Sequence, residues 1–479
     1  MFGLRTIGGN ALSILTSDAM NRATSFVLYA LVARRLGAHE FGQLALALSL
    51  FYTFQIFAIG GLKTLIIREV ARDRAQTGDH FLNGAAIVVA TSLCTMAAAF
   101  GFVRLMSYAA DTSLVICLLS LGLLPSALSA VCEAIFQAWE EMRLIPWVNV
   151  PGNLCKVGSA FLLLSSKQGL FAIIVVLLLS MLAVAAAECW ILVRRFPVRG
   201  ARLDFRSALR MARSALTFLG IDGSVAIESS LNLILLSKLS SESQVGFYSA
   251  AVQLMAPVLL VYQSIAQTIL PMLCKEIGPD SLRLKQTTER ATEFLLALAL
   301  PTVVGAIFLG DWLLVLAYRN PVFLQAFPAL RIIFCVLVLQ VFSSMLGQVL
   351  VAVRRERVVL RIAVVDILLN ICIGWLLIGR FGLVGAAITF FLVRMACCLQ
   401  HCVAVWDILQ PIPIVRIAWK PALAAVGMAA CLILTDGRSR ILSGMAATLV
   451  YFAALAALTV WTSGGPREFR AKYLPLLSR

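Results

Sequence analysis

The chain is organised around residues Asn10–Leu50, and the first half of this stretch, Asn10–Leu36, reads NALSILTSDAMNRATSFVLYALVARRL. This first half is long enough and apolar enough to cross a bilayer, which takes about 20 residues. It nevertheless carries Asp18 and Arg22 near its middle, four residues apart and therefore on one face of a helix. A charged side chain at that depth is costly in hydrocarbon, so it is expected to face a polar cavity or a partner. Asp18 and Arg22 are therefore candidate functional residues.

The composition is that of a membrane protein. Of the 479 residues, 61% are hydrophobic and only 13% are charged, and the mean hydropathy is +0.93. A soluble domain usually has about 25% charged residues. The apolar runs predict an all-α, polytopic membrane protein with about 14 transmembrane helices, near residues 11–36, 41–67, 81–107, 112–137, 144–166, 169–193, 215–238, 245–274, 293–317, 324–352, 358–379, 382–406, 417–435 and 440–462.

The net charge of +16 invites comparison with nucleic-acid-binding proteins, but the placement of the charge argues against that class. Most of the 40 Lys and Arg residues fall in loops on the side of the two termini, above all in the Arg-rich loop 194–213. The positive-inside rule then places both termini in the cytoplasm. We therefore expect no nucleic acid among the partners. We do expect membrane lipids, because basic loops also attract anionic headgroups.

Short motifs recur in the two halves of the chain. The matching stretches are Leu31–Leu36 with Leu235–Leu239, Phe41–Ala47 with Val245–Ala251, and Gly169–Ala172 with Gly382–Ala387. An even number of spans per repeat keeps both repeats in the same orientation, and transporters often bind substrate between such units. We predict an N-terminal six-helix lobe over 1–200, a C-terminal six-helix lobe over 201–406, and two additional helices with a cytoplasmic tail over 407–479.

Further polar residues lie inside the predicted spans, and each is either a structural contact or part of a substrate site. For Lys63, two interpretations stay open, because its side chain can reach the membrane surface or point into the cavity that Arg22 faces. Span seven is polar like span one, its counterpart in the repeat. The candidates beyond span one are Lys63, Lys156, Asp222, Glu228, Asn232, Asp366 and Asn370.

The sequence carries no pattern that indicates a cofactor, a metal site or an enzyme. The 12 Cys include no CxxC pair, and we interpret them as small packing residues. Cys398, His401 and Cys402 share a helix turn, but packing is favoured there over a three-ligand metal site. The three His lack a plausible nucleophile beside them, and no DxD motif or phosphate-binding loop occurs.

Four stretches are similar to one known family: Ala33–Gly42, Gly60-Gly61 with Arg68–Arg72, Val245–Ala251, and Phe381–Ala387. Together they resemble the bacterial polysaccharide flippases of the multidrug/oligosaccharidyl-lipid/polysaccharide exporter superfamily, over residues 5–406. The resemblance implies two lobes around a central, often cationic cavity. It also implies transport of an undecaprenyl-diphosphate-linked oligosaccharide from the cytoplasmic to the outer leaflet of the bacterial inner membrane. This transport would serve exopolysaccharide or O-antigen biosynthesis, beside a polymerase and export machinery.

The predicted roles of the candidate residues follow from the chemistry of such a substrate. Arg makes bidentate, charge-assisted hydrogen bonds to phosphate, so Arg22, with Lys63 and Lys156, would hold the diphosphate. Asp18 would pair with Arg22 in the empty site. Family members often carry an Asp late in span seven, where this chain has Asn232. Glu228 or Asp222 would then supply the carboxylate, and Asp366 and Asn370 would meet sugar hydroxyls or take part in ion coupling.

Two alternatives remain at this point. A drug or small-cation exporter of the same superfamily should have an acidic cavity, whereas these spans hold both signs of charge. A membrane polymerase or glycosyltransferase should present a sizeable outward loop with catalytic residues, whereas the outward turns here are as short as Gly37–Glu40. The flippase is the favoured interpretation, and the sequence leaves the glycan, the coupling ion and the oligomeric state open.

Overall fold

The computed structural model describes residues 4–198, 200, 202–276, 281–409, 413–435, 437 and 439–462, without the side chains of residues 4–15, 18, 217, 218, 221, 222, 263, 267, 271 and 281. All regular structure in these ranges is helical. The elements are α1 (Leu4–Leu36), α2 (Ala38–Ile59), α3 (Leu62–Arg72), η1 (Arg74–Gln76), α4 (Thr77–Met106), α5 (Ala110–Ser120), α6 (Leu123–Ala138), α7 (Leu144–Ser165), α8 (Leu170–Arg195), α9 (Phe205–Leu239), α10 (Glu242–Lys275), α11 (Ser281–Tyr318), η2 (Pro321–Ala326), α12 (Phe327–Ala352), α13 (Glu356–Leu409), α14 (Ile414–Leu434) and α15 (Arg440–Thr462).

The helices confirm the all-α, multi-span class. Within the described ranges, ten helical segments are long and apolar enough to cross a membrane. In this number, α2 and α3 together form one segment, and α5 and α6 together form another. The 54-residue α13 contains a break at Gly382, where φ is 54° and ψ is −124°, so it supplies two spans. Glycine adopts such a conformation without the strain that a Cβ would bring. The second half of α13 and the long polar helices α1, α7 and α9 account for the remaining predicted spans.

Two helices begin earlier than the sequence analysis expects. The loop expected over 194–213 ends at Asp204, whose side chain accepts a hydrogen bond from the Arg206 backbone amide and caps α9. An Asp at this position satisfies an otherwise unpaired helix amide, which favours helix from Phe205 onward. The span expected near 293–317 begins at Ser281 instead, as the first turns of α11, which runs to Tyr318.

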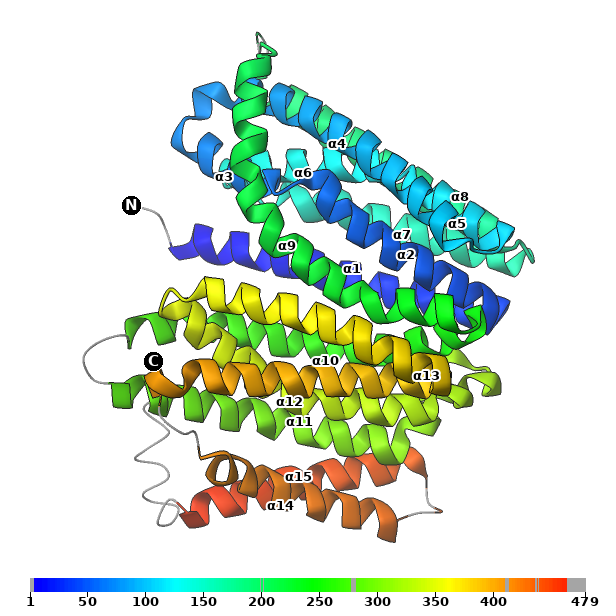
Figure 1. Cartoon of the computed structure of the whole chain (residues 1–479), viewed down its shortest axis with the longest axis vertical. Coiled ribbons are helices and arrows are strands. Elements are labelled where there is room, and N and C mark those ends of the chain that lie inside the picture. The colour runs from blue at the N-terminus through cyan, green and yellow to red at the C-terminus, as the bar shows by residue number, and fades with distance from the viewer. Residues whose placement is uncertain are drawn as a thin grey trace. The chain divides into compact units, whose positions relative to one another are not determined.

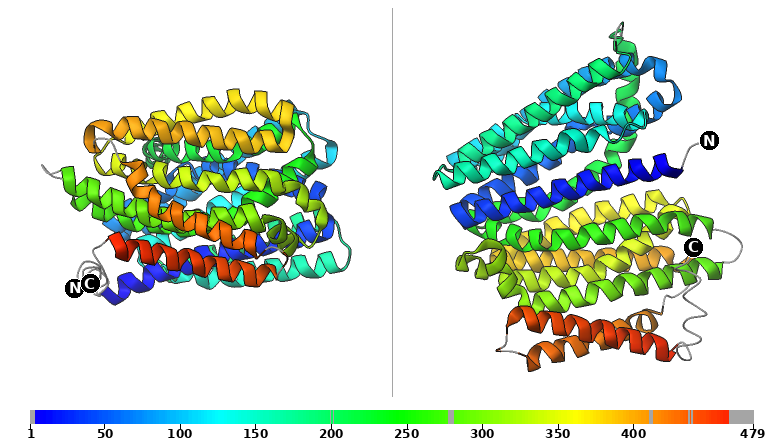
Figure 2. Two further views of the ribbon diagram at one scale, coloured as in Figure 1. Left: turned by 90° about the horizontal axis from the view of Figure 1, so that it is seen from below. Right: turned by 180° about the vertical axis from the view of Figure 1, so that it is seen from behind.

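The chain divides into two compact units, residues Met1–Ser249 and Ala250–Arg479. The first unit contains α1–α9 and the start of α10, and the second contains the rest of α10 and α11–α15. In the second unit, α12 packs against α11 and α13, and α14 and α15 form a hairpin beside α11 (Figures 1 and 2). The division at residues 200/201 and 406/407 stays a prediction.

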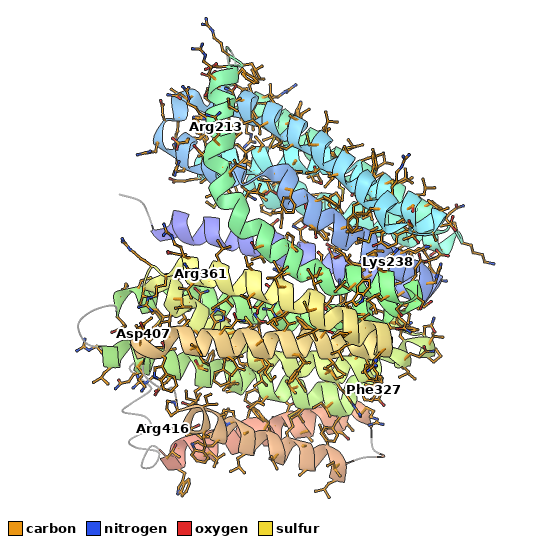
Figure 3. All side chains as sticks on the ribbon, viewed as in Figure 1. Arg213, Lys238, Phe327, Arg361, Asp407 and Arg416 are labelled. Carbon is orange, nitrogen blue, oxygen red and sulfur yellow. The ribbon has the colours of Figure 1, made fainter. Side chains whose placement is uncertain are left out.

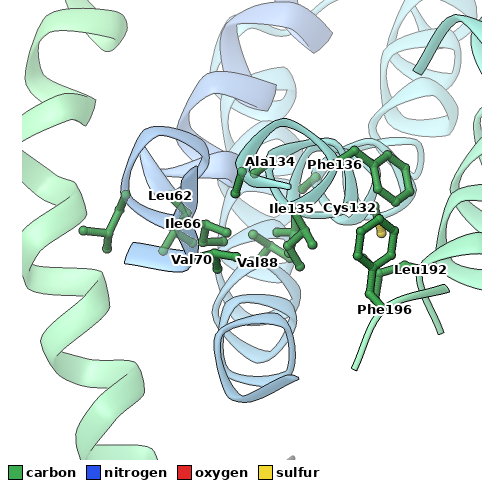
Figure 4. Close-up of a cluster of buried hydrophobic side chains, with 14 of the residues drawn as sticks. Leu62, Ile66, Val70, Val88, Cys132, Ala134, Ile135, Phe136, Leu192 and Phe196 are labelled. Atoms are coloured by element: carbon green, nitrogen blue, oxygen red, sulfur yellow. The ribbon is translucent and has the colours of Figure 1, made fainter. Parts of the chain in front are cut away.

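The core of the first unit lies where α3, α4, α6 and α8 meet (Figure 4). Ile66 of α3, Ile135 and Phe136 of α6 and Leu192 of α8 are fully buried there, and the Phe136 and Phe196 rings lie 5.6 Å apart. Lipid tails are as apolar as these side chains, so close packing holds such helices together in a bilayer. This core fixes the ends of α6 and α8 relative to α3.

The two glycines of the repeated Phe/Val-Gly motif lie against each other. A Cβ added to Gly42 of α2 would overlap the Glu242 carbonyl oxygen, and one added to Gly246 of α10 would overlap the Ala38 carbonyl oxygen. The Glu242 carboxylate accepts hydrogen bonds at this crossing from Gln43 Nε2 (3.1 Å) and from the Thr112 hydroxyl. The motif therefore marks a backbone-to-backbone crossing of α2 and α10 within the first unit.

Candidate functional site

The first unit contains a partly open polar cavity of about 310 Å³. Six helices contribute to its wall: α1, α2, α3, α6, α7 and α8. Most of the lining side chains are amides, hydroxyls or charged groups, which is unusual for a helical membrane bundle. The lining residues are Asn21, Gln55, Ile56, Ile59, Lys63, Ser126, Ser129, Ala130, Glu133, Asn149, Gly152, Asn153, Lys156, Ser180, Met181 and Val184.

Lys63 reaches the cavity because the chain turns sharply between α2 and α3. Gly60 and Gly61 both have positive φ, 62° and 74°, which glycine adopts at no steric cost. The turn places Lys63 on the first turn of α3, where its Nζ lies 2.7 Å from Glu133 Oε2 of α6. Asn149 Nδ2 donates to the other Glu133 oxygen at 3.2 Å. Lys63 thus lines a cavity, but Arg22, which was expected to face the same cavity, is not among the lining residues.

One face of α7 supplies the second half of the polar wall. Asn149, Asn153 and Lys156 are spaced by three or four residues, so they share a face of that helix. Lys156 Nζ donates to Asn153 Oδ1 at 2.6 Å, and the Asn153 amide in turn contacts Asn21 Oδ1 of α1. The two lysines therefore have different partners: Lys63 contacts a carboxylate and Lys156 an amide.

A buried carboxylate lies behind the cavity wall. Glu188 of α8 is fully buried, and its Oε2 accepts a hydrogen bond from the hydroxyl of Ser129, a lining residue. Its Oε1 has no hydrogen-bond partner within the described part of the chain. Sequence reasoning did not select Glu133 or Glu188. The available signal was that each is a charged residue inside an apolar run, as Lys63 is.

The predicted residues of spans one and seven occupy different environments. Arg22 follows the lining residue Asn21 on α1, but it does not line the cavity itself and its side chain is exposed. The side chains of Asp18 and Asp222 lie outside the described residues. On α9, Glu228 is half-buried, and Asn232 is 5% exposed with an Oδ1 that has no hydrogen-bond partner among the described groups.

Asp366 and Asn370 lie in the second unit, on the first half of α13. Both are buried, and Gln400 of the second half donates to Asp366 Oδ1 at 2.9 Å. The break at Gly382 lets the two halves of α13 run side by side, which brings residues 34 positions apart into contact. These two candidates therefore belong to a separate polar cluster.

The described residues contain no group of three or more His, Cys, Asp or Glu side chains arranged to hold a metal ion. In the Cys398–Cys402 turn, the His401 ring nitrogen Nδ1 instead lies 2.9 Å from the Cys397 carbonyl oxygen. The polar cavity of the first unit, with two cationic and one anionic lining side chains, is thus the candidate site. Its amide and hydroxyl groups suit a ligand that is itself rich in hydrogen-bonding groups.

Comparisons with known proteins identify the family and the fold. The family model described as "Polysaccharide biosynthesis protein" matches residues 7–276, and the MatE model matches residues 224–376. A probable low-salt glycan biosynthesis flippase of Haloferax volcanii is 22% identical over 385 residues, which is 79% of each chain.

Solved structures share the fold at low sequence identity. The lipid II flippase MurJ in an inward closed conformation is 15% identical, with a TM-score of 0.74 over 94% of this chain and 98% of that one. An inward-facing multidrug resistance transporter of the MATE family is 14% identical, with a TM-score of 0.69 over 81% of this chain and 95% of that one. The chain belongs to the polysaccharide biosynthesis protein family, a flippase family of the multidrug/oligosaccharidyl-lipid/polysaccharide exporter superfamily.

Proposed function

We propose that this chain is a flippase that moves an undecaprenyl-diphosphate-linked oligosaccharide from the cytoplasmic to the outer leaflet of the inner membrane, without catalysing a chemical reaction. The observation that carries the proposal is the presence of two lysines, Lys63 and Lys156, in one polar cavity of the first unit. A diphosphate is dianionic or more, so it needs cations to replace its hydration. The surrounding amides and hydroxyls suit sugar hydroxyl groups.

The contacts among the cavity side chains suggest how a diphosphate enters the cavity. Lys63 is held by Glu133, and an incoming diphosphate would compete with that carboxylate for the same ammonium group. Within the described part of the chain, Lys156 donates to the neutral amide of Asn153 and forms no ion pair, so it is the easier cation to engage first. The lipid would be released in the outer leaflet when the ion pair between Glu133 and Lys63 forms again. Alternating access would expose the cavity first to the cytoplasmic side and then to the outer leaflet.

The remaining expectations fit this function as proposals. Arg22, next to the lining residue Asn21, would extend the cationic surface toward the substrate, with Asp18 as its partner in the empty state. Asp222, Glu228, Asn232, Asp366 and Asn370 would serve the glycan or the coupling ion. Both termini would be cytoplasmic, and the product would pass to a polymerase and export machinery in the outer leaflet.

The experiment is transport in proteoliposomes that contain a fluorescent undecaprenyl-diphosphate oligosaccharide, scored by the fraction that a membrane-impermeant reductant can bleach. We expect the Lys63→Gln/Lys156→Gln double variant to lose at least about 10-fold in rate, because two charge-assisted contacts disappear. The Lys63→Arg/Lys156→Arg variant should retain transport. Lys275→Gln, a cation removed from the exposed end of α10, is the matched control.

Two outcomes would overturn parts of this proposal. Normal transport by the double glutamine variant, at equal amounts of folded protein, would exclude the cavity as the diphosphate site. Wild-type protein that leaves the lipid in place but moves a cationic dye would instead make the chain a drug exporter.

A further inference from the structure

A groove of about 660 Å³ lies between the start of α7 and the end of α8. These helices are joined by the short segment 166–169 and pack against each other, so they form a hairpin whose two open ends meet. Arg143, which precedes α7, therefore lies beside the last turn of α8. The groove is lined by Arg143, Leu144, Trp147, Val148, Trp190, Ile191, Arg194 and Arg195.

Two tryptophans are strongly exposed in this groove. Trp147 of α7 is 78% exposed and Trp190 of α8 is 58% exposed. Such exposure leaves much of each apolar ring uncovered by protein, and tryptophan in this position is typical of the boundary between hydrocarbon and headgroups. The groove therefore lies at the depth of the lipid headgroups.

The charge of the groove is entirely positive. None of its lining residues is acidic, whereas three are arginines. Arg194 stacks over the Trp190 ring, with its guanidinium carbon 4.7 Å from the ring centre, which holds the side chain along the groove. Arg143 is bound by Glu141 outside the groove, with Nε 2.9 Å from Oε2. Arg195 is exposed.

The floor of the groove belongs to the core of the first unit. Leu144 is 6% exposed and Ile191 packs against the same buried cluster as Leu192 and Phe136. The arginines and tryptophans thus lie on helix ends that pack against the core. Binding therefore does not require a loop to become ordered. A preformed site loses less entropy on binding than a flexible one.

We propose that this groove binds the phosphate headgroup of an anionic phospholipid of the surrounding leaflet, independently of the transported lipid. The guanidinium groups of Arg194 and Arg195 donate to the phosphate oxygens, since the arginine fork matches phosphate geometry. The two indole rings flank the glycerol and the first carbons of the acyl chains. Phosphatidylglycerol and cardiolipin carry this chemistry, and a zwitterionic lipid lacks the net charge that Arg194 and Arg195 select.

The test uses the native tryptophans of the full-length protein in vesicles. We compare fluorescence quenching by phosphatidylglycerol and by phosphatidylcholine, each brominated near the headgroup end of its acyl chains, at equal mole fractions. We expect stronger quenching by phosphatidylglycerol. The excess should disappear in a Trp147→Phe/Trp190→Phe variant, which assigns the signal to the groove.

Charge variants then test the arginines. Arg194→Gln/Arg195→Gln should lower the preference for phosphatidylglycerol by roughly 10- to 30-fold, from the usual contribution of a basic residue at an anionic surface. Arg194→Lys/Arg195→Lys should retain part of it. Arg104→Gln/Lys167→Gln removes two exposed cations from the opposite helix ends and should change nothing.

Three results would overturn the proposal. Equal quenching by both lipids means that the groove does not select anionic headgroups. If the Arg194→Gln/Arg195→Gln variant keeps the preference for phosphatidylglycerol, these two arginines do not cause the selectivity. Displacement of the brominated phosphatidylglycerol by equimolar undecaprenyl diphosphate makes the groove an entry site for the transported lipid. If the protein does not transport the lipid-linked oligosaccharide in the proteoliposome assay, these three quenching measurements still test the groove.

Discussion

At the scale of single residues, every charged side chain that lines the cavity is held by a polar neighbour on its own or another helix. Lys63 pairs with Glu133, and Lys156 contacts Asn153. A charge inside a bundle is tolerated when partners or water replace its hydration. Such contacts also give a site two states: the charged side chain binds either its partner within the protein or the ligand.

Glu133→Gln tests this exchange. The amide keeps the shape of the side chain but removes the negative charge that holds Lys63, so undecaprenyl diphosphate should bind about 2- to 5-fold more tightly, the magnitude of a partly exposed ion pair. Transport should slow, because the carboxylate no longer helps release the lipid. Native mass spectrometry gives the affinity and the proteoliposome assay gives the rate.

The matched control for that variant is Asp407→Asn. It breaks an exposed ion pair with Arg355, 2.8 Å apart, in the second unit and leaves the cavity intact. Binding that is unchanged or weaker in Glu133→Gln, beside a normal control, would mean that Glu133 does not compete with the substrate.

At the scale of helices, glycines decide where helices cross and where they turn. Gly60 and Gly61 separate α2 from α3 and bring Lys63 into the cavity, while Gly382 folds α13 into two antiparallel halves. Gly42 and Gly246 permit the close crossing of α2 and α10. Small residues at such crossings let helix backbones approach and make up for the weak hydrophobic driving force in lipid.

Gly42→Ala should therefore destabilise the protein. The new Cβ would overlap the Glu242 carbonyl oxygen, a backbone atom that cannot rotate away, so we expect a loss of about 1–3 kcal/mol. A thiol-reactive dye can follow thermal unfolding, because Cys132 and Cys397 are buried in the folded protein. The melting temperature should fall.

Gly101→Ala is the control for this substitution. Gly101 lies inside α4 with no atom near the position of an added Cβ, so alanine should be neutral or stabilise by about 0.4–1 kcal/mol. Equal melting temperatures for the two variants would show that the α2–α10 crossing tolerates a side chain and that the repeated glycine has another role.

At the scale of the whole molecule, labelled side chains identify the two ends of the helices within each unit. In the second unit, Arg361, Asp407 and Arg416 lie at one end and Phe327 at the other, and in the first unit Arg213 and Lys238 mark opposite ends of α9 (Figure 3). The end with Arg361 and Arg416 belongs to the loops that the positive-inside rule assigns to the cytoplasm.

Cysteine labelling in spheroplasts tests the resulting topology. In a variant that lacks the 12 native cysteines, Val322→Cys should react with a membrane-impermeant maleimide from outside, and Arg357→Cys only after permeabilisation. Both side chains are exposed, and the 26-residue helix α12 separates them by about 39 Å. The reverse pattern would invert the orientation of the whole chain and contradict cytoplasmic termini.

The spans and their order could be predicted because they depend on local properties. A run of about 20 apolar residues must form a helix in lipid, where no water satisfies the backbone. The errors were at helix ends: α9 starts at Phe205 and α11 at Ser281, because residues between membrane and cytoplasm can continue a helix without being apolar. The candidate site was only partly predictable. Lys63 and Lys156 line the cavity, whereas Glu133 and Asn21 join it through contacts between distant segments.

The sequence alone determined the membrane class, the approximate spans, the family and the presence of charged groups inside helices, since each is a property of composition or of a short motif. Only the tertiary structure decided which of those groups share a cavity. The reason is geometric: a buried charge must have a partner, but any of a dozen neighbouring helices can provide it. The helix that provides the partner depends on how glycine turns and helix crossings orient the faces of the helices. The turn before α3, for example, brings Lys63 to Glu133 of α6.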